Sequence, residues 1–270
     1  MGSSLGMPQP ITNYVREPYL TLETDALDKL PDMAVLVAKI FATWASIERD
    51  LNVLLVRLIG ANSAPAHAIY SILRTQSLQS TALQAAAKSS LDPRFFDAFL
   101  AVMTILDGAK ASRNKLAHWQ WGKCKERPDL LVIADPDRLK EKDRDVIAWF
   151  QEFDPTSPKL KEWFENGFER MQFDPKHFIA FTKADLEREV RDLKQAAHIL
   201  LMFGMVLDPS SGMANAKAFG LPEGREELRE KLFARLNDEQ LFRAALAQTA
   251  ASRRSNGPPH GESRPPNPGE

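Results

Sequence analysis

The sequence predicts an all-α fold that carries one short β-hairpin. Apolar residues recur at three- and four-residue steps over several long stretches, which is the period of an amphipathic helix. Helix-capping residues precede some of these stretches, and strand-like alternation is confined to residues 119–133. We therefore expect an antiparallel four-helix bundle with a hairpin and a helical insertion between helices 3 and 4, followed by C-terminal helices.

The first three helices are predicted from apolar stripes and their end signals. The first stripe covers about residues 25–59, and the glycine and polar residues after it end the helix. A shorter stripe covers about residues 64–89. The third helix begins at Pro93, because Asp92 is a good N-cap and proline is favoured at the first helical position. Its stripe runs to Leu116 and is interrupted by Arg113.

The segment after His118 predicts a hairpin and an insertion. Trp119-Gln120-Trp121 alternates and residues 130–133 are rich in β-formers, with turn residues between them. The insertion should contain two short helices, at about 140–152 and 158–171. Its aromatic residues at helical spacing are expected to pack on the bundle, with a base-stacking platform as the alternative. These residues are Trp149, Phe150, Trp163, Phe164 and Phe168.

The remaining helices follow from capping signals. Thr182 and Asp185 have capping-box spacing and open a fourth helix over about 183–207. Two further helices are expected at about 223–236 and 238–250, the second capped by Asn237 and Gln240. The predicted organisation is as follows: a flexible leader at 1–24, a helical domain at 25–207 with its insertion at about 119–178, a C-terminal helical extension at 208–251 and a disordered tail at 252–270.

Composition narrows the classes of function. The formal net charge is −1, so global attraction to nucleic acid is not expected. The first residues do not resemble a signal peptide, no stretch is apolar enough to span a membrane, and the single cysteine excludes an internal disulfide. These features predict a cytoplasmic protein without membrane association. We see no metal-ligand spacing and no cofactor motif, so no metal and no cofactor are expected.

A local excess of positive charge surrounds the end of the third helix. Six basic residues lie between positions 107 and 127 against two acidic ones. The arrangement is typical of a solvated surface, and equally of a small phosphate-binding patch. Candidate RNA-binding residues are Lys110, Lys115, Lys123, Lys125 and Arg127.

Arg113 and His118 are the candidate catalytic pair. A histidine can transfer a proton near neutral pH, and an arginine can hold a phosphate with permanently charged donors. On an ideal helix the two residues point about 140° apart, so they share a site only if the helix ends or bends or if a two-fold interface brings two copies together. Asn114 lies one turn before His118 and could orient it or a phosphate. Glu48 interrupts the apolar face of the first helix, and an ion pair between Glu48 and Arg113 is the purely structural interpretation.

Arg113-Asn114 followed by His118 resembles the Arg-x(4–6)-His signature of the HEPN superfamily. The order of helices, the insertion before the last one and an acid at the position of Glu48 are similar as well, and the resemblance covers about residues 25–207. It implies a HEPN-like bundle. It also implies a metal-independent endoribonuclease, in a toxin–antitoxin or anti-phage defence role. Products would carry 2′,3′-cyclic phosphate ends.

The resemblance also implies roles and partners. His118 would act in proton transfer, Arg113 would stabilise charge on the phosphorane, Asn114 would position the phosphate and Glu48 would orient Arg113 or the histidine. RNA, a second copy of the chain in a homodimer, and an antitoxin or defence-system partner protein are the expected partners. The alternative is a non-catalytic HEPN-like helical module for protein interaction or nucleotide binding, in which the same residues form a structural network.

Overall fold

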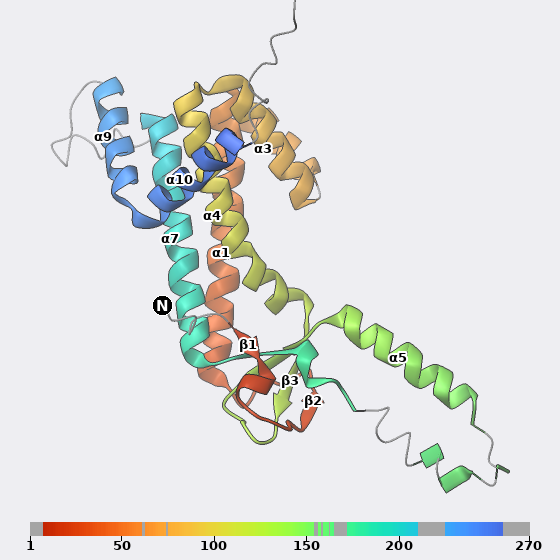
Figure 1. Cartoon of the computed structure of the whole chain (residues 1–270). Helices are drawn as coiled ribbons and strands as arrows, with labels where there is room; N and C mark the ends of the chain where they lie inside the picture. Colours follow the sequence, from red (N-terminus) through yellow and green to blue (C-terminus); the bar gives the residue numbers. More distant parts are fainter. Residues whose placement is uncertain are drawn as a thin grey trace, which may run out of the picture. The chain divides into compact units, whose positions relative to one another are not determined.

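The computed structural model shows a mostly helical chain with one small antiparallel sheet (Figure 1). It describes residues 8–60, 63–73, 75–153, 156–157, 159–161, 163–164, 172–209 and 225–255. The α-helices are α1 (Pro31–Ile59), α2 (Ser63–Ile72), α3 (Gln76–Ser90), α4 (Pro93–His118), α5 (Pro136–Gln151), α7 (Lys183–Leu207), α9 (Arg225–Asp238) and α10 (Gln240–Ser255). The strands and 3₁₀ turns are β1 (Gln9–Pro10), η1 (Ile11–Asn13), β2 (Leu20–Leu22), β3 (Gln120–Cys124), β4 (Leu131–Ala134), η2 (Pro175–His177) and β5 (Phe178–Phe181).

Local side chains set the helix ends. The Asp92 carboxylate accepts the backbone N–H of Phe95 at 3.1 Å and starts α4 as predicted. Thr182 and Asp185 form the predicted capping box, because each side chain accepts the other residue's backbone N–H, at 2.9 and 3.1 Å. Gly60 ends α1 with φ of 59°, a backbone conformation that glycine adopts without strain.

The chain divides into two compact units whose boundaries fall inside α1, α4 and α7. The first unit contains residues 1–46 and 109–195, and the second contains residues 47–108 and 196–270. We expected one helical domain at 25–207 with an extension after it, and the observed division is different. Each of the three long helices contributes one segment to each unit, so the boundaries do not fall in loops.

The sheet belongs to the first unit and has the strand order β1-β5-β4-β3-β2, all antiparallel. The predicted hairpin is confirmed as β3 and β4, where Trp121 pairs with Ile133. Every residue of the central strand β4 is buried. One face of the sheet packs in an apolar cluster around Val132, Phe178 and Ile11.

The prediction of a flexible leader is wrong for residues 9–22. β1 pairs with β5 and β2 pairs with β3, so residues of the leader form both edges of the sheet. Ile11 between them is completely buried. Strands of two and three residues have no measurable period, which is why the sequence pattern did not reveal them.

Side-chain contacts connect the parts of α1, α4 and α7 that belong to the first unit. Lys183 at the start of α7 forms an ion pair with Asp32 at the start of α1 at 2.6 Å. The Ser112 hydroxyl of α4 donates to Glu189 of α7 at 2.7 Å. These contacts place the first turns of α7 beside both α1 and the end of α4.

The second unit is entirely helical in the part of it that is described. Phe99 of α4 lies 6.4 Å from Phe203 of α7, and Phe95 lies 5.4 Å from Phe233 of α9, measured between ring centres. The predicted second helix is two helices, α2 and α3, because Thr75 caps a new helix by accepting the N–H of Leu78 at 3.3 Å. Ile69 and Ile72, which we expected in the apolar stripe of that helix, are exposed.

Other expectations about the C-terminal half of the chain need correction. The tail was predicted to begin at Ser252, but α10 continues to Ser255, and positions 256–270 lie outside the described residues. Asn237 does not cap α10, because α9 includes it and ends at Asp238. The predicted helix at 158–171 lies mostly outside the described residues.

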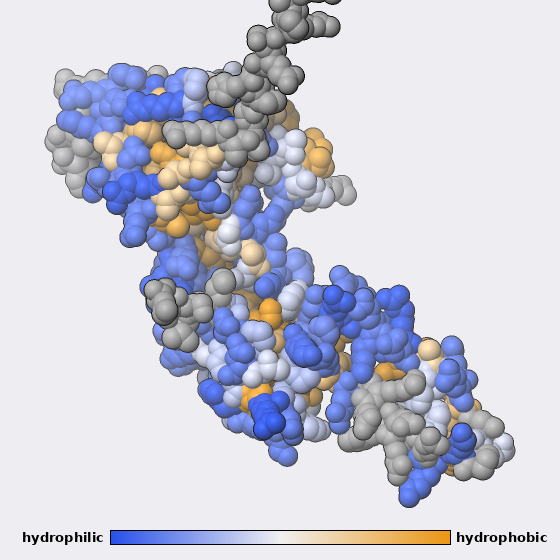
Figure 2. All heavy atoms as spheres, viewed as in Figure 1, coloured by the Kyte–Doolittle hydropathy of each residue, from blue (hydrophilic) through white to orange (hydrophobic). Residues whose placement is uncertain are grey.

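The aromatic residues of the insertion pack on one another. Trp149 stacks on Trp163 with ring centres 3.7 Å apart, and Phe150 lies 5.9 Å from Trp163. Phe150 and Phe164 are exposed. These ring contacts lie within the insertion, and our expectation that the residues also pack on the bundle stays a prediction. Phe168 lies outside the described residues. Figure 2 shows that α5 itself carries mostly hydrophilic residues on the face drawn.

Candidate functional site

The candidate pair lies in the last turns of α4, in the first unit. Arg113 is half-buried, and its guanidinium carbon lies 5.9 Å from the ring centres of both Phe41 and Trp44 of α1. Its Nη1 donates to the side-chain oxygen of Asn114 at 3.1 Å. Its Nε is buried and has no hydrogen-bond partner among the described residues. Two aromatic rings and one amide thus hold the guanidinium in place.

His118 is the last residue of α4 and is exposed. The helix ends there, as the switch to a strand pattern predicts, but it neither ends nor is interrupted between Arg113 and His118. Asn114 lies one turn before His118 and therefore on the same side of α4. Because the Arg113 guanidinium reaches Asn114, this amide connects the arginine to the side of the helix that carries the histidine.

Glu48 lies on α1 in the second unit. The Gln76 side-chain amide of α3 donates to its carboxylate at 3.2 Å. Burial, and secondly the charge of Glu48, raises the pKa of Tyr70 to about 12. Glu48 thus belongs to a polar group with Gln76 and Tyr70, and its pairing with Arg113 stays a prediction.

The predicted RNA-binding residues do not form one uncompensated positive surface. Lys123 forms ion pairs with Glu23 and Asp25, and Arg127 makes two 2.8 Å bonds to Asp129. Within the described part of the chain, no ion pair is present at Lys110, Lys115 or Lys125. The charge available for phosphate therefore comes from Lys110, Lys115, Lys125 and Arg113.

Two aromatic rings accompany these lysines. The Lys115 ammonium lies 5.4 Å from the ring centre of Trp119, and the Lys125 ammonium lies 5.8 Å from that of Tyr19. A cation beside an aromatic ring is a common element of nucleic-acid binding surfaces.

Glu189 is a polar group near the motif that the sequence did not indicate. Burial raises the pKa of Glu189, and the charges of Asp192 and Asp185 act in the same direction. Its carboxylate accepts the hydroxyl of Ser112, the residue before Arg113. Glu189 lies in a charge-rich stretch of α7 that is typical of a solvated helix face, so its burial had no visible signal in the sequence.

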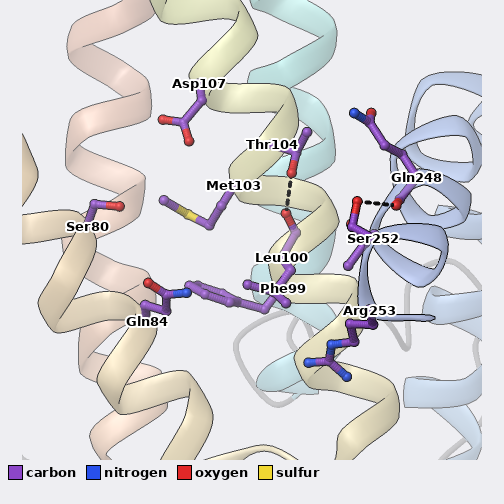
Figure 3. A pocket seen from close by; sticks show the side chains of 11 residues that line it. Ser80, Gln84, Phe99, Leu100, Met103, Thr104, Asp107, Gln248, Ser252 and Arg253 are labelled. Atoms are coloured by element: carbon purple, nitrogen blue, oxygen red, sulfur yellow. Dashed lines mark hydrogen bonds between the residues drawn. The ribbon is translucent and has the colours of Figure 1, made fainter. Parts of the chain in front are cut away.

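A hollow lies in the second unit, and none of the predicted site residues lines it. It has a volume of about 480 Å³ and lies between α3, α4 and α10. Figure 3 shows Ser80 and Gln84 of α3 opposite Met103 and Asp107 of α4. Apolar side chains and side chains with hydroxyl or amide groups both line this hollow.

Cys124 is a buried residue of strand β3. Burial raises the pKa of its thiol, which donates to Glu126 at 3.4 Å. Among the described residues, no group of three or more His, Cys, Asp or Glu side chains is placed to hold a metal ion.

Comparison of the chain with protein-family models, with curated proteins and with solved structures found no match. The HEPN resemblance therefore rests on the motif residues and the order of elements. None of the described helices combines the length and the apolar character needed to cross a membrane.

Proposed function

We propose that the protein is a metal-independent endoribonuclease of HEPN type that acts in a toxin or anti-phage defence role. The observation that carries the proposal is the arrangement at the end of α4. A fixed arginine donates to Asn114, and Asn114 shares its side of the helix with an exposed histidine. Phosphoryl-transfer chemistry needs a rigid cation together with a proton-transfer group that solvent and substrate can reach.

In this mechanism the ribose 2′-oxygen attacks the adjacent phosphorus and the bond from phosphorus to the 5′-oxygen breaks. His118 either accepts the proton of the 2′-hydroxyl or donates one to the leaving 5′-oxygen. Arg113 stabilises the negative charge of the phosphorane, and Asn114 orients the phosphate. Each chain offers one such histidine, so a homodimer that brings two of them together supplies both the acid and the base.

Glu48 has an indirect role in this proposal. It orients Arg113 or His118, as the resemblance implies, and does not touch the phosphate. An antitoxin or another defence-system protein is the partner expected to restrain the activity in a cytoplasmic setting.

A non-catalytic helical module for interaction or nucleotide binding is the second candidate. One observation favours it: the Arg113 guanidinium is already occupied by two rings and one amide, which is typical of a structural arginine. In that case His118 is a solvent-exposed residue at the end of the helix and has no catalytic role.

Expression of the wild type beside His118→Ala separates the two candidates. We expect the wild type to slow growth and degrade cellular RNA, and His118→Ala to do neither. His198→Ala is the matched control, because His198 is also an exposed helical histidine but lies in the second unit. Intact RNA and normal growth with the wild type would contradict the nuclease and leave the helical module.

A further inference from the structure

A hollow of about 470 Å³ adjoins the end of α4 in the first unit. The last turn of α4, the start of β3 and the residues at the end of β2 line it. Figure 1 labels β2 and β3, two of the elements that line this hollow. Its volume falls within the range of small-ligand sites, about 300–1,000 Å³. We call it the α4–β3 hollow.

Two tryptophans form its aromatic walls. Trp119 and Trp121 both line the hollow, and both are only partly buried. The Trp121 indole N–H donates to the backbone carbonyl of Leu116 at 3.0 Å, which fixes that ring against the last turn of α4. Partly exposed indole rings that line a hollow can serve as a platform on which a flat heterocycle stacks.

β2 can lie close enough to complete the hollow because position 122 is glycine. A Cβ atom at Gly122 would lie 2.3 Å from the backbone oxygen of Thr21. The N–H of Glu23 donates to the carbonyl of Trp121 at 3.0 Å, which continues the pairing of β2 with β3. Glu23 is therefore held directly opposite Trp121.

Polar groups for the edge of a heterocycle lie at the rim. The Glu23 carboxylate is oriented by the Thr21 hydroxyl at 2.8 Å and by the Lys123 ammonium. Each carboxylate oxygen can accept more than one hydrogen bond, so it keeps acceptor capacity for an N–H donor. Gln120 is exposed at the rim and offers both a donor and an acceptor.

The positive charge beside the hollow suits a phosphate attached to that heterocycle. The Lys115 ammonium lies over the Trp119 ring. Ala117 and Trp119, the neighbours of His118 in the chain, both line the hollow. The chain segment that carries His118 therefore borders the hollow.

We propose that the α4–β3 hollow binds one nucleobase of single-stranded RNA by stacking on Trp119 and Trp121. The choice of RNA as the source of the base rests on the proposed function. The hollow gives the candidate nuclease a base-binding subsite next to His118, with Glu23 and Gln120 contacting the edge of the base.

The test measures binding separately from cleavage. The full chain carrying His118→Ala is titrated against a fluorescein-labelled oligoadenylate, and the fluorescence anisotropy of the RNA gives its affinity. The same measurement uses an abasic chain of equal length, and free adenosine 5′-monophosphate serves as a competitor. Three further substitutions are made in this His118→Ala chain. Trp119→Ala removes the stacking ring, Trp119→Phe retains a ring, and Gln84→Ala in the second unit is the control. Circular dichroism melting of each variant confirms that it is folded.

We expect Trp119→Ala to weaken binding of the base-bearing RNA by about ten- to a hundredfold. Trp119→Phe should restore most of the affinity, and Gln84→Ala should leave it unchanged. Equal affinity for the abasic and base-bearing chains, or an unchanged affinity in Trp119→Ala, would overturn the inference. Trp119-dependent binding of the free nucleotide without binding of RNA would overturn RNA as the source of the base.

The experiments distinguish a failure of base binding in the hollow from a failure of the nuclease activity. RNA that binds through Trp119 but is not cut by the wild type supports the base-binding hollow and contradicts the nuclease. RNA that the wild type cuts, but that Trp119→Ala binds as tightly as its parent, supports the nuclease and overturns the hollow.

Discussion

At the scale of single residues, Arg113 has the best-defined environment of the predicted site. Its cation lies against two aromatic rings, and one of its nitrogens donates to Asn114. Removing the side chain takes away these contacts and leaves the Asn114 oxygen without this donor. His118 lacks comparable contacts, since no hydrogen bond or ion pair to its side chain is present in the described part of the chain. The two motif residues should therefore differ sharply in their effect on stability.

We expect Arg113→Ala to lower the free energy of unfolding by about 1–3 kcal/mol, and His118→Ala to change it by less than about 0.5 kcal/mol. Urea unfolding followed by circular dichroism measures both values. Arg243→Ala is the control, because Arg243 is an exposed arginine on α10. Equal effects of Arg113→Ala and Arg243→Ala would contradict the anchored role of Arg113.

Glu189 predicts a pH dependence of stability. Burial raises its pKa in the folded protein, so the folded state binds the proton more tightly than the unfolded chain does. The stability due to this proton is fully present below the pKa of the unfolded chain, and it is lost as the pH rises through the higher pKa of the folded state. Glu189→Gln, which is always neutral, should therefore be more stable than wild type at pH 7.

The stability advantage of Glu189→Gln over wild type should shrink as the pH falls through the raised pKa of the folded state. It should be lost below about pH 4, where an ordinary glutamate is protonated in the unfolded chain as well. Urea midpoints of wild type and Glu189→Gln at neutral and acidic pH give the comparison. Glu187→Gln on the same helix is the control, since no side-chain hydrogen bond of Glu187 is present among the described residues. An advantage of Glu189→Gln that is the same at both pH values would rule out this explanation.

At the scale of elements, the β2–β3 contact depends on a single glycine. A Cβ atom at Gly122 would meet the backbone of Thr21 at 2.3 Å, whereas one at Gly108 in α4 would meet nothing within 4 Å. Substitution of glycine by alanine should therefore have opposite effects on the stability of the protein at the two positions. Backbone cannot move aside as a flexible side chain can, so the strain at position 122 must separate the strands.

We expect Gly122→Ala to destabilise the protein by about 1–3 kcal/mol, and Gly108→Ala to stabilise it by about 0.5–1 kcal/mol because alanine favours the helix. Thermal unfolding of both variants beside wild type checks the pair. A Gly122→Ala protein as stable as wild type would show that β2 does not approach β3 this closely.

The sequence indicated the long elements far better than the short ones. α4 and α7 were predicted within a residue or two because long apolar stripes coincide with caps at Asp92, Thr182 and Asp185. β1 and β2 were missed because strands of two and three residues have no detectable period. β5 was missed because its partners β1 and β4 are distant in the chain, so no hairpin turn marks it. The motif residues were found by their chemistry. The burial of Glu189 and the α4–β3 hollow depend on contacts between helices and strands that are remote in sequence.

At the scale of the whole molecule, the proposed chemistry requires two copies of the chain. One chain contributes one histidine at the end of α4, while cleavage of RNA needs a base and an acid. A two-fold interface that includes the ends of two α4 helices would supply both groups.

Light scattering at micromolar concentration should give twice the chain mass of 30.3 kDa. A mixture of wild-type and His118→Ala chains tests whether the two copies share one site. If each cleavage needs one histidine from each copy, mixed dimers should not cut RNA, so an excess of His118→Ala should lower the activity below that of the same amount of wild type alone. A monomeric mass, or a mixture that keeps the full activity of its wild-type chains, would contradict the shared site.

The most direct test of the proposed nuclease uses purified protein, EDTA and an RNA in which the nucleotide at the cleaved position carries either a 2′-hydroxyl or a 2′-hydrogen. We expect wild type to cut the ribose form in EDTA and to leave a 2′,3′-cyclic phosphate, which mass spectrometry identifies. It should not cut the 2′-deoxy form at that position, and His118→Ala should cut neither. Cleavage of the 2′-deoxy position, activity that EDTA abolishes, or equal cleavage by His118→Ala would contradict the proposed function.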